Sequence, residues 1–448
     1  MLDVVSWAER FIATPSVSRD GNAAMAELAT ELLAEIGVTA RRERHELDGV
    51  EHWLVLADLP GSDPALGGEG LILLTHLDTV PPGPLDAWTA TRGDPFRPTR
   101  DGDRLYGLGS ADAKVDLVCK AAGLEQIDRS KLRRPIRVVG TFAEEVGLIG
   151  ARRFAEGGGT TGFRYALVGE PSELAGVRAH KGYAVFEARV PLPDAPPCAR
   201  DERAIEATFR GVAAHSSTPH LGDNALQRAL DRLAESDVVA VSALMAGGAT
   251  NVVPDTAELS LRVRGARGDA ASKDARNAFD PAPIAAFHRA WRALLRDLAD
   301  TRDTDFDPDH TVGNLASARI EGGELVARFD LRPVPGVDPE AAIEPLRAVA
   351  RVALVRYNPP LATPADGRLV RCVEAAQREV GLAPRITTKA TCTEAGLLSQ
   401  HGVEAVVLGA GTSIGNVHKP NEHTLVSQLG RARDLYADIL GRLCVEDG

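Results

Sequence analysis

Residues 71–81 read LILLTHLDTVP, an apolar run that delivers His76 and, two residues later, Asp78. Residues 137–145 read RVVGTFAEE, a second apolar run that ends in two adjacent glutamates. A third apolar run, at 165–168, is followed by Gly-Glu-Pro. Short apolar runs bounded by glycine, proline and polar residues are typical of buried strands. Because ligands of open α/β sheets bind beyond the carboxyl ends of the strands, these acidic and imidazole side chains are predicted to share one site.

Around these runs, helical and strand patterns alternate through the first part of the chain. The alternation predicts an α/β fold whose catalytic domain has a mostly parallel sheet with helices on both faces. The expected elements are an amphipathic helix at 1–10, a helix at 22–37, and strands at 53–59, 71–74, 136–142 and 165–168.

The pattern then changes to that of an inserted α+β domain, and the helix–strand alternation returns from about residue 368. The predicted organisation is a catalytic metal-binding domain formed by 1–179 and 361–448, with a lid domain at 180–360 between its two parts. The segment 266–278 is charged and rich in small residues, so a mobile loop is expected there. In the lid, paired strands are expected at 183–190 with 204–210 and at 312–320 with 324–331, further strands at 238–245 and 257–263, and helices at 225–234 and 283–298. In the returning part, a helix is expected at 369–380 and a strand at 405–408.

The composition excludes several classes of protein. A chain of 448 residues is too long for one ordinary core, and its net charge of −12 argues against nucleic-acid partners. No apolar run approaches the length of a membrane span, so no membrane partner is expected. The first residues carry acid where a signal peptide carries base, which predicts a cytoplasmic protein. The five cysteines form no CxxC pair, so neither a disulfide framework nor a Cys-ligated zinc site is indicated.

Carboxylates and imidazoles without thiolates suit a hydrolytic site that holds zinc, cobalt or manganese. Two cations roughly 3.5–4 Å apart need a bridging group, and a carboxylate with two oxygens can supply it. Asp112 is the predicted bridge. We expect His76 and Glu170 to hold one metal, and Glu145 and His418 to hold the other.

Two further residues complete the predicted site. Glu144, next to a ligand but facing elsewhere, is the expected general base, which takes a proton from water and returns it to the leaving amine. Asp78 is expected to accept the ring N–H of His76 and so fix its tautomer.

Each of these residues has an ordinary alternative. A lone histidine at a strand end is usually only hydrogen-bonded or solvated, paired glutamates usually lie on a solvated helix face, and Asp112 could cap a helix that begins near residue 113. Five such residues occur together, four of them at strand ends or at a glycine-flanked turn of one sheet domain, and this makes independent ordinary roles the weaker explanation. Serine or cysteine hydrolysis through Ser110 or Cys119 is excluded by context, because neither lies in a GxSxG string.

The motifs as a set resemble the M20 family of metallohydrolases, and most closely its acetylornithine deacetylase branch. The resemblance runs from near the N-terminus to about residue 425. The strings that carry it are HLDTVP (76–81), Trp88, DPF (94–96), LYGLGSADAK (105–114), EEVG (144–147), GEPS (169–172), VRAHKG (177–182), CTEA (392–395) and His418.

The resemblance implies the ligand set and base given above, and a smaller lid domain through which the protein forms a homodimer. The string GVAAHSS (211–217) matches the family segment whose histidine reaches across the dimer, which implies that His215 donates to the tetrahedral oxyanion. A histidine in a surface turn is the alternative. Asn251 with Arg264, or else Arg332, would hold a substrate carboxylate bidentately, and both arginines could equally be solvated strand residues.

The implied activity is a two-metal amidohydrolase, zinc being the leading metal, that removes the N-acyl group from a small-molecule acyl amino acid. N-acetylornithine is the leading substrate. The alternatives are a succinyl-diaminopimelate desuccinylase, another N-acyl amino-acid hydrolase, or a dipeptidase or carboxypeptidase. The alternative from a different functional class is a non-catalytic binding protein with the same fold. One departure stands out: Val115 and Asp116 follow the Asp112 motif where the family commonly has glycine, which adds bulk and charge close to the site.

Overall fold

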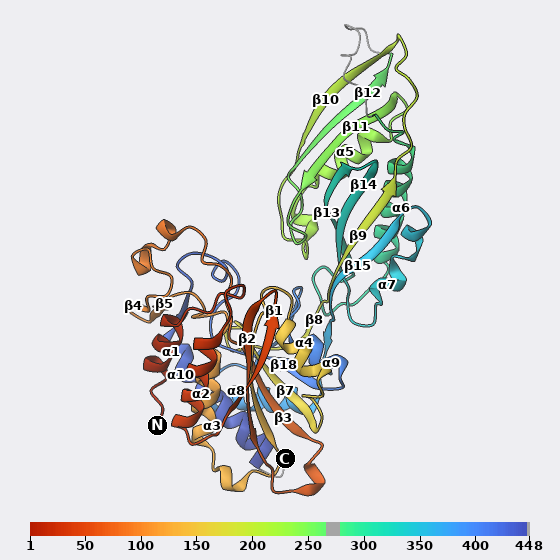
Figure 1. The fold of residues 1–448 in the computed structure, drawn as a ribbon. Helices are drawn as coiled ribbons and strands as arrows, with labels where there is room; N and C mark the ends of the chain where they lie inside the picture. Colours follow the sequence, from red (N-terminus) through yellow and green to blue (C-terminus); the bar gives the residue numbers. More distant parts are fainter. Residues whose placement is uncertain (266–277, 446–448) are drawn as a thin grey trace. The chain divides into compact units, whose positions relative to one another are not determined.

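The computed structural model describes residues 1–265 and 278–445 (Figure 1). The predicted loop at 266–278 lies, except for its last residue, outside the described residues. The chain divides into two compact units, each with its own core. The first comprises residues 1–179, 361–388 and 393–448, and the second comprises residues 180–360 and 389–392.

The first unit is built on a mixed sheet with the order β1-β2-β6-β3-β7-β18-β8-β16, to which β17 adds by pairing with β8. Its four central strands are parallel: β6 (Ile136–Thr141), β3 (Gly70–His76), β7 (Phe163–Gly169) and β18 (Glu404–Val407). The sheet continues through antiparallel pairing with β2 (Val50–Leu59), then β1 (Arg41–Leu47), and on the other side with β8 (Gly176–His180). The last two strands are β16 (Leu361–Ala362) and β17 (Ile386–Lys389). The predicted α/β class is confirmed, with parallel pairing among the four central strands.

Side chains of each central strand point alternately into two cores, which explains why these runs are apolar throughout. Leu71 and Leu73 of β3 face one core, whereas Ile72 and Leu74 face the other. The first core is closed by α1 (Val4–Ala13), α2 (Ala23–Glu35), α3 (Asp116–Gln126), α8 (Arg368–Glu379) and α10 (Val426–Leu440). The second core is closed by α4 (Ile149–Glu156) and α9 (Ala395–Gln400), so helices cover both faces as predicted.

A small three-stranded sheet with the order β19-β5-β4 fixes the loops that carry Asp112 and His418. Its strands are β4 (Thr99–Asp101), β5 (Arg104–Tyr106) and β19 (His423–Leu425). The β5 strand precedes the Asp112 loop and the β19 strand follows the His418 loop, and the two strands pair directly. Two segments that are far apart in the sequence are thereby joined.

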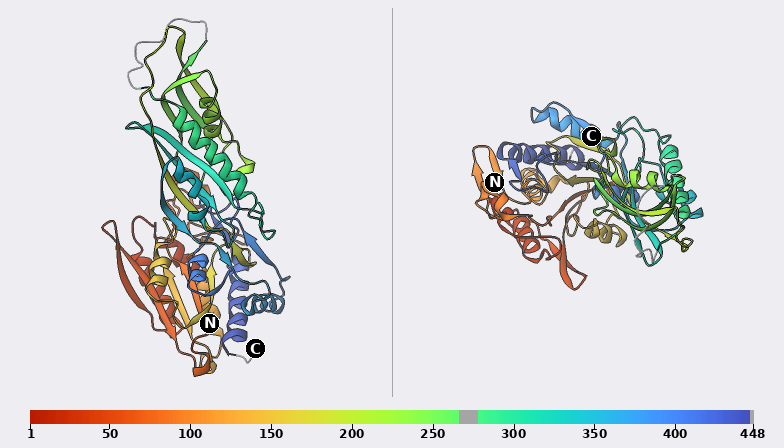
Figure 2. Two further views of the ribbon diagram at one scale, coloured as in Figure 1. Left: turned by 90° about the vertical axis from the view of Figure 1, so that its right-hand side faces the viewer. Right: turned by 90° about the horizontal axis from the view of Figure 1, so that it is seen from above.

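The second unit is a seven-stranded antiparallel sheet whose one face is covered by α5 (Ala225–Leu233) and α6 (Ala282–Leu298) (Figure 2). In order across the sheet, its strands are β10 (Glu202–Arg210), β12 (Thr256–Arg264), β11 (Val238–Gly247), β13 (Val312–Glu321), β14 (Glu324–Arg332), β9 (Tyr183–Pro191) and β15 (Arg351–Asn358). A short helix, α7 (Pro339–Ala342), precedes β15.

One predicted strand pairing in this unit is wrong. The segments 183–190 and 204–210 do form strands, β9 and β10, but they do not pair with each other. Strand β9 lies between β14 and β15, whereas β10 pairs with β12 at the edge of the sheet. The predicted pair at 312–320 and 324–331 is confirmed as the β13–β14 hairpin.

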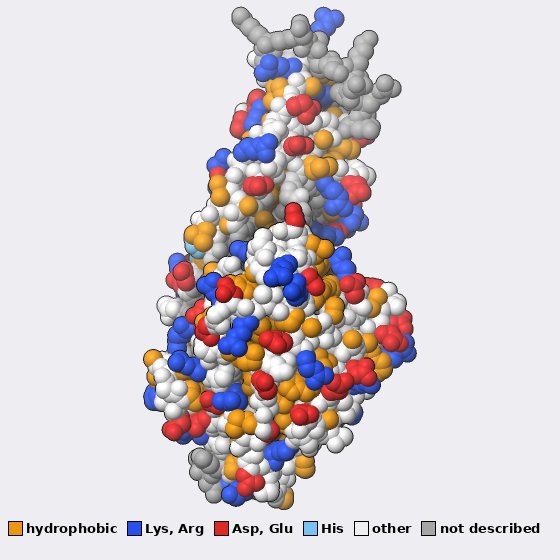
Figure 3. Space-filling view, turned by 90° about the vertical axis from the view of Figure 1, so that its left-hand side faces the viewer, with side chains coloured by type: hydrophobic (Ala, Val, Ile, Leu, Met, Phe, Trp, Pro, Cys, Tyr) orange, Lys and Arg blue, Asp and Glu red, His pale blue; other side chains and the backbone are white. Residues whose placement is uncertain are grey.

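Within the described part of the chain, no helix combines the length and the apolar character needed to cross a lipid bilayer. On the face that Figure 3 shows, basic and acidic side chains are interspersed.

We expect the substitution Phe329→Ala to destabilise the second unit selectively. Phe329 is fully buried on β14, with its ring centroid 5.2 Å from those of Phe186 and Trp291. Removing the ring leaves a cavity, which should lower the free energy of unfolding by about 3–5 kcal/mol. Urea denaturation would measure the loss, and amide hydrogen exchange should place it in β9, β13 and β14.

The matched control is Met245→Ala on β11, because Met245 is 66% exposed on the same sheet. Its effect should stay within about 0.5 kcal/mol. Equal loss of amide protection in β3 and β6 of the Phe329→Ala variant would contradict a separate core in each unit.

Candidate metal centre

The carboxyl edge of the parallel strands brings the predicted ligands together. His76 is the last residue of β3, and Glu170 directly follows β7. Glu144 and Glu145 lie in the turn after β6. Asp112 and His418 come from the two loops held by the small sheet.

These side chains form two groups that share one member. His76, Asp112 and Glu170 make one group, and Asp112, Glu145 and His418 make the other, with the ligand atoms of each group within 4.8 Å of one another. The Oδ1 atom of Asp112 lies 3.2 Å from His76 Nε2, and its Oδ2 atom lies 3.2 Å from His418 Nε2. Asp112 therefore presents one oxygen to each group, which is the geometry of a bridging carboxylate.

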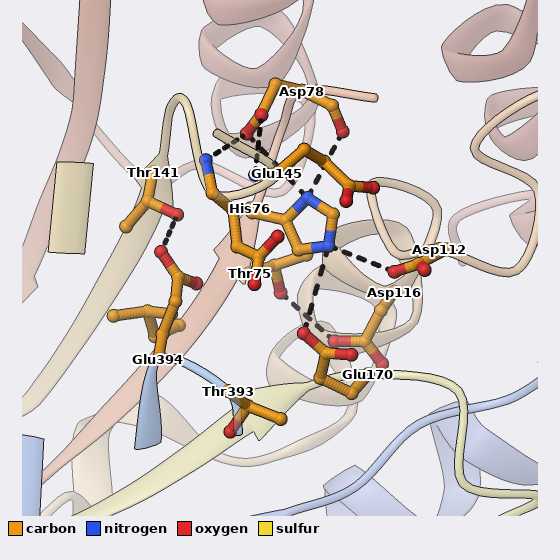
Figure 4. Close-up of polar contacts among 12 residues, drawn as sticks. Thr75, His76, Asp78, Asp112, Asp116, Thr141, Glu145, Glu170, Thr393 and Glu394 are labelled. Atoms are coloured by element: carbon orange, nitrogen blue, oxygen red, sulfur yellow. Dashed lines mark hydrogen bonds and ion pairs between the residues drawn. The ribbon is translucent and has the colours of Figure 1, made fainter. Parts of the chain in front are cut away.

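The remaining contacts complete each group. Glu170 Oε1 is 3.9 Å from His76 Nε2, a contact drawn in Figure 4. Glu145 Oε1 and Oε2 each lie 3.1 Å from His418 Nε2. The donor set contains only nitrogen and oxygen, which fits a hydrolytic zinc, cobalt or manganese site.

The electrostatics of the groups also favour bound cations. Burial opposes a charge on His76, but the carboxylates of Asp112, Glu144 and Asp78 outweigh burial and raise the pKa of His76 well above its usual value. Hydrogen bonds to Asp112 and Glu145 raise the pKa of His418 to about 11. The carboxylates of both groups therefore favour positive charge at this site.

The structure gives the Asp78 carboxylate a different role from the predicted one. His76 Nδ1 lies 3.1 Å from the backbone carbonyl oxygen of Asp78 but 3.7 Å from its carboxylate. The tautomer is therefore fixed by a backbone acceptor. The Asp78 carboxylate instead accepts hydrogen bonds from the backbone N–H groups of Glu144 and Glu145, at 3.1 and 3.3 Å, and from Ser18 Oγ at 2.6 Å.

This contact holds the turn that carries the predicted base. Ala143, immediately before Glu144, has a φ of 52°, a left-handed conformation that is strained for a residue with a side chain. Burial, together with the negative charge of Glu145, raises the pKa of Glu144 well above its ordinary value. A carboxyl group with a raised pKa is suited to take up a proton near neutral pH.

Asp112 does not cap a helix, because α3 begins at Asp116 and its N-cap is Val115. The Asp112 loop is instead held by Glu422, a buried residue whose role the sequence did not reveal. The backbone N–H groups of Ala111 and Asp112 donate to Glu422 Oε1 at 2.9 and 3.1 Å. Burial and the charge of Asp112 raise the pKa of Glu422 to about 8.

Glu394 is a second buried acid that sequence reasoning missed, although it lies in the CTEA string. Its Oε1 atom accepts a hydrogen bond of 2.7 Å from Thr141 at the end of β6. Its Oε2 atom has no hydrogen-bond partner among the described residues, and burial raises the pKa of Glu394 to about 7. A carboxyl group so placed adds to the negative character of the site whenever it is ionised.

In the second unit, three of the four predicted lid residues lie together. His215 Nδ1 is 2.7 Å from Ser217 Oγ, and burial with the charge of Arg332 lowers the pKa of His215 to about 4. The neighbouring Ser216 donates its N–H to the carbonyl oxygen of Asn251, and its Oγ accepts from Arg332 Nη2 at 2.8 Å. Arg332 is buried, with its Nε 3.1 Å from Asp330 Oδ2.

Arg264 does not belong to this cluster, and its pairing with Asn251 stays a prediction that the structure of one chain does not support. Asn251 precedes the start of β12 at Thr256, whereas Arg264 ends that strand. At about 3.3 Å per residue, the two ends of β12 are roughly 26 Å apart, too far for one small carboxylate.

Residues 72–442 match the model of the peptidase family M20/M25/M40. The acetylornithine deacetylase of Myxococcus xanthus is 28% identical over 457 residues, covering 97% of this chain and 95% of the relative. The structure is similar to an aminoacylhistidine dipeptidase from Vibrio alginolyticus (TM-score 0.69, 16% identity, 98% and 96% of the two chains). It is also similar to an M20 family metallo-carboxypeptidase from Sulfolobus solfataricus (TM-score 0.62, 18% identity, 98% and 99%). At these sequence identities, the similarity to the solved structures establishes the fold alone.

The shared position of Asp112 predicts how metal content responds to ligand substitutions. We expect Glu170→Ala and Glu145→Ala each to lose one of two bound ions, because each removes a ligand from one group only. Asp112→Ala should lose both. Elemental analysis of chelated protein after reloading with zinc would measure the ions per chain, with Glu35→Ala, an exposed carboxylate on α2, as the control. Full metal content in Asp112→Ala would contradict the bridge.

Proposed function

Because the chain belongs to the M20 peptidase family, we propose that it is a two-metal amidohydrolase that removes the N-acyl group from an acyl amino acid. The family match covers residues 72–442, so the predicted resemblance is confirmed and the chain is a metallohydrolase. The observation that carries the proposal is the Asp112 carboxylate, which faces one histidine with each oxygen at 3.2 Å. A shared carboxylate suits a pair of cations better than a single one.

Zinc is the leading metal, with cobalt and manganese as alternatives for the same donors. His76 and Glu170 would hold one ion, Glu145 and His418 the other, and Asp112 would bridge them. Two divalent ions in such a site would polarise the acyl oxygen and make a water molecule acidic at neutral pH. The rest of the chemistry falls to the side chains.

Glu144 is the proposed general base. Its carboxylate would take a proton from the attacking water and return it to the nitrogen of the leaving amine. The support is its place beside Glu145, the Asp78 contact that fixes its turn, and the raised pKa that suits it to hold a proton between the two steps.

His215 is the proposed donor to the oxyanion, contributed by the lid of a second copy in a homodimer. Its lowered pKa keeps the imidazole neutral at neutral pH, and the other ring nitrogen can then donate an N–H. Arg332, with Asn251, is the proposed contact for the substrate carboxylate. Its position beside the His215 segment favours it over Arg264.

The proposed substrate is N-acetylornithine, hydrolysed to ornithine and acetate in the cytoplasm. The support is the name of the relative that matches nearly the full chain at 28% identity. Cleavage of a succinylated amino acid, a dipeptide or a C-terminal residue is the second candidate, because a dipeptidase and a carboxypeptidase share this fold.

The direct test is release of amine from N-acetylornithine by chelated enzyme, before and after addition of zinc or cobalt. We expect no release without metal and full release after reloading. N-succinyl-diaminopimelate and small dipeptides run in parallel would identify the second candidate. Release that is unaffected by chelation would overturn the two-metal proposal.

We expect Glu144→Gln to lower kcat by about 10²–10⁴-fold, because the amide cannot carry the proton. The variant should still bind both metals, since Glu144 belongs to neither ligand group. Steady-state kinetics and elemental analysis on the same sample measure the two effects. Glu173→Gln, an exposed carboxylate three residues after Glu170, serves as the control. A Glu144→Gln enzyme of full activity would remove Glu144 from the mechanism.

A further inference from the structure

A buried ion pair lies behind the His76 group, and the proposed chemistry does not use it. Asp116 and Lys120 are one turn apart on α3, with Lys120 Nζ 2.8 Å from Asp116 Oδ2 and side-chain exposures of 5% and 0%. Asp116 stands at one of the two positions where the family commonly has glycine. A charged pair so deeply buried needs partners for its remaining hydrogen-bonding atoms.

Those partners come from the end of β3, the strand that delivers His76. Lys120 Nζ donates to the carbonyl oxygen of Leu74 at 2.6 Å and to Thr75 Oγ1 at 2.9 Å. Thr75 Oγ1 in turn donates to Asp116 Oδ2 at 3.0 Å, a contact drawn in Figure 4. The residue directly before His76 is therefore tied to both charges.

The same pair contacts the end of β7, which delivers Glu170. A Cβ atom on Gly169 would lie 2.1 Å from Asp116 Oδ2 and 2.9 Å from Lys120 Nζ. Only glycine permits the strand end to approach the pair so closely. The residue directly before Glu170 is thus packed against Asp116.

Tyr436 of α10 closes the network from a third side. Its hydroxyl lies 2.6 Å from Asp116 Oδ1 and 2.8 Å from the carbonyl oxygen of Leu408, the residue after β18. The ends of three parallel strands are therefore linked to one carboxylate, those of β3 and β7 directly and that of β18 through Tyr436. Because Lys120 balances its charge, Asp116 adds little net negative charge to the acidic site.

We propose that the Asp116–Lys120 pair, with Tyr436, positions His76 and Glu170 and thereby sets the affinity of one of the two metal sites. The other group differs: among the described residues, no hydrogen bond or ion pair joins Glu145 or His418 to the pair. The effect is accordingly specific to the His76–Asp112–Glu170 site. The inference rests on the metal centre proposed above.

Three variants test the network without leaving a single charge buried. Tyr436→Phe removes one hydroxyl, Thr75→Val removes another at nearly constant volume, and the double variant Asp116→Asn/Lys120→Met removes both charges together. The matched control is Tyr165→Phe, another buried tyrosine, located near the start of β7 at the opposite edge of the sheet.

Chelated protein would be titrated with Zn²⁺ in a calorimeter, without substrate. Wild-type protein and Tyr165→Phe should bind two ions. In each of the three network variants, the affinity of one binding event should fall about 10–100-fold, the usual effect of substituting a residue that holds a metal ligand in place. The affinity of the other binding event should stay unchanged. The weakened event should be the one absent in Glu170→Ala, and thermal unfolding of the metal-free variants checks that they remain folded.

Unchanged affinity at both sites, or equal weakening of both, would overturn the inference, since a purely structural role would not distinguish one site from the other. A wild-type protein that binds no Zn²⁺ would be a different failure, because it would overturn the metal centre itself. The readout is binding alone, so loss of activity for other reasons does not enter it.

Discussion

Negative charge gathered at the carboxyl edge of four parallel strands is the constraint on which this structure depends. Two carboxylates 4 Å apart repel by about 4 kcal/mol at an effective dielectric constant of 20, and several acids share this edge. The protein stabilises these carboxylates one by one, each with its own hydrogen-bond donors or its own counter-ion. Asp78 is held by two backbone N–H groups and a serine hydroxyl, Glu422 by two backbone N–H groups, and Asp116 by Lys120. The carboxylates of the two histidine groups are among those left facing one another, together with Glu144 and Glu394, and bound cations would relieve their repulsion.

Much of this site could be predicted from the sequence because its parts are local. A buried parallel strand is apolar on both faces, so the polar residue at its end stands out, as His76 does after LILLT. The pairing of β9 could not be predicted in the same way, because its neighbours β14 and β15 come more than a hundred residues later. Strand neighbours in an antiparallel sheet are chosen by long-range packing, which a local pattern does not record.

The residues that sequence reasoning missed share a physical cause. Asp116 and Lys120 are four residues apart on a helix, so their ion pair could be inferred from the sequence. No local sequence pattern shows that Tyr436 contacts Asp116. Glu422 lies four residues after His418, yet its function is to accept hydrogen bonds from N–H groups some 310 residues earlier in the chain. Asp78 was placed correctly and misjudged in role, because a backbone carbonyl oxygen competes with its own carboxylate for His76 Nδ1.

The two ligand groups are held by different kinds of structure. The His76 side chain is fully buried on a central strand, whereas that of His418 is 50% exposed and its backbone has a left-handed φ of 59°. A strand end fixed by packing and by a buried ion pair has little conformational entropy left to lose when an ion binds. A loop histidine in a strained conformation must be kept in place by its partners, here Asp112 and Glu145. Asp112 belongs both to the rigid His76 group and to the more adaptable His418 group. A change in the contacts that hold the Asp112 loop must therefore alter the geometry of both groups.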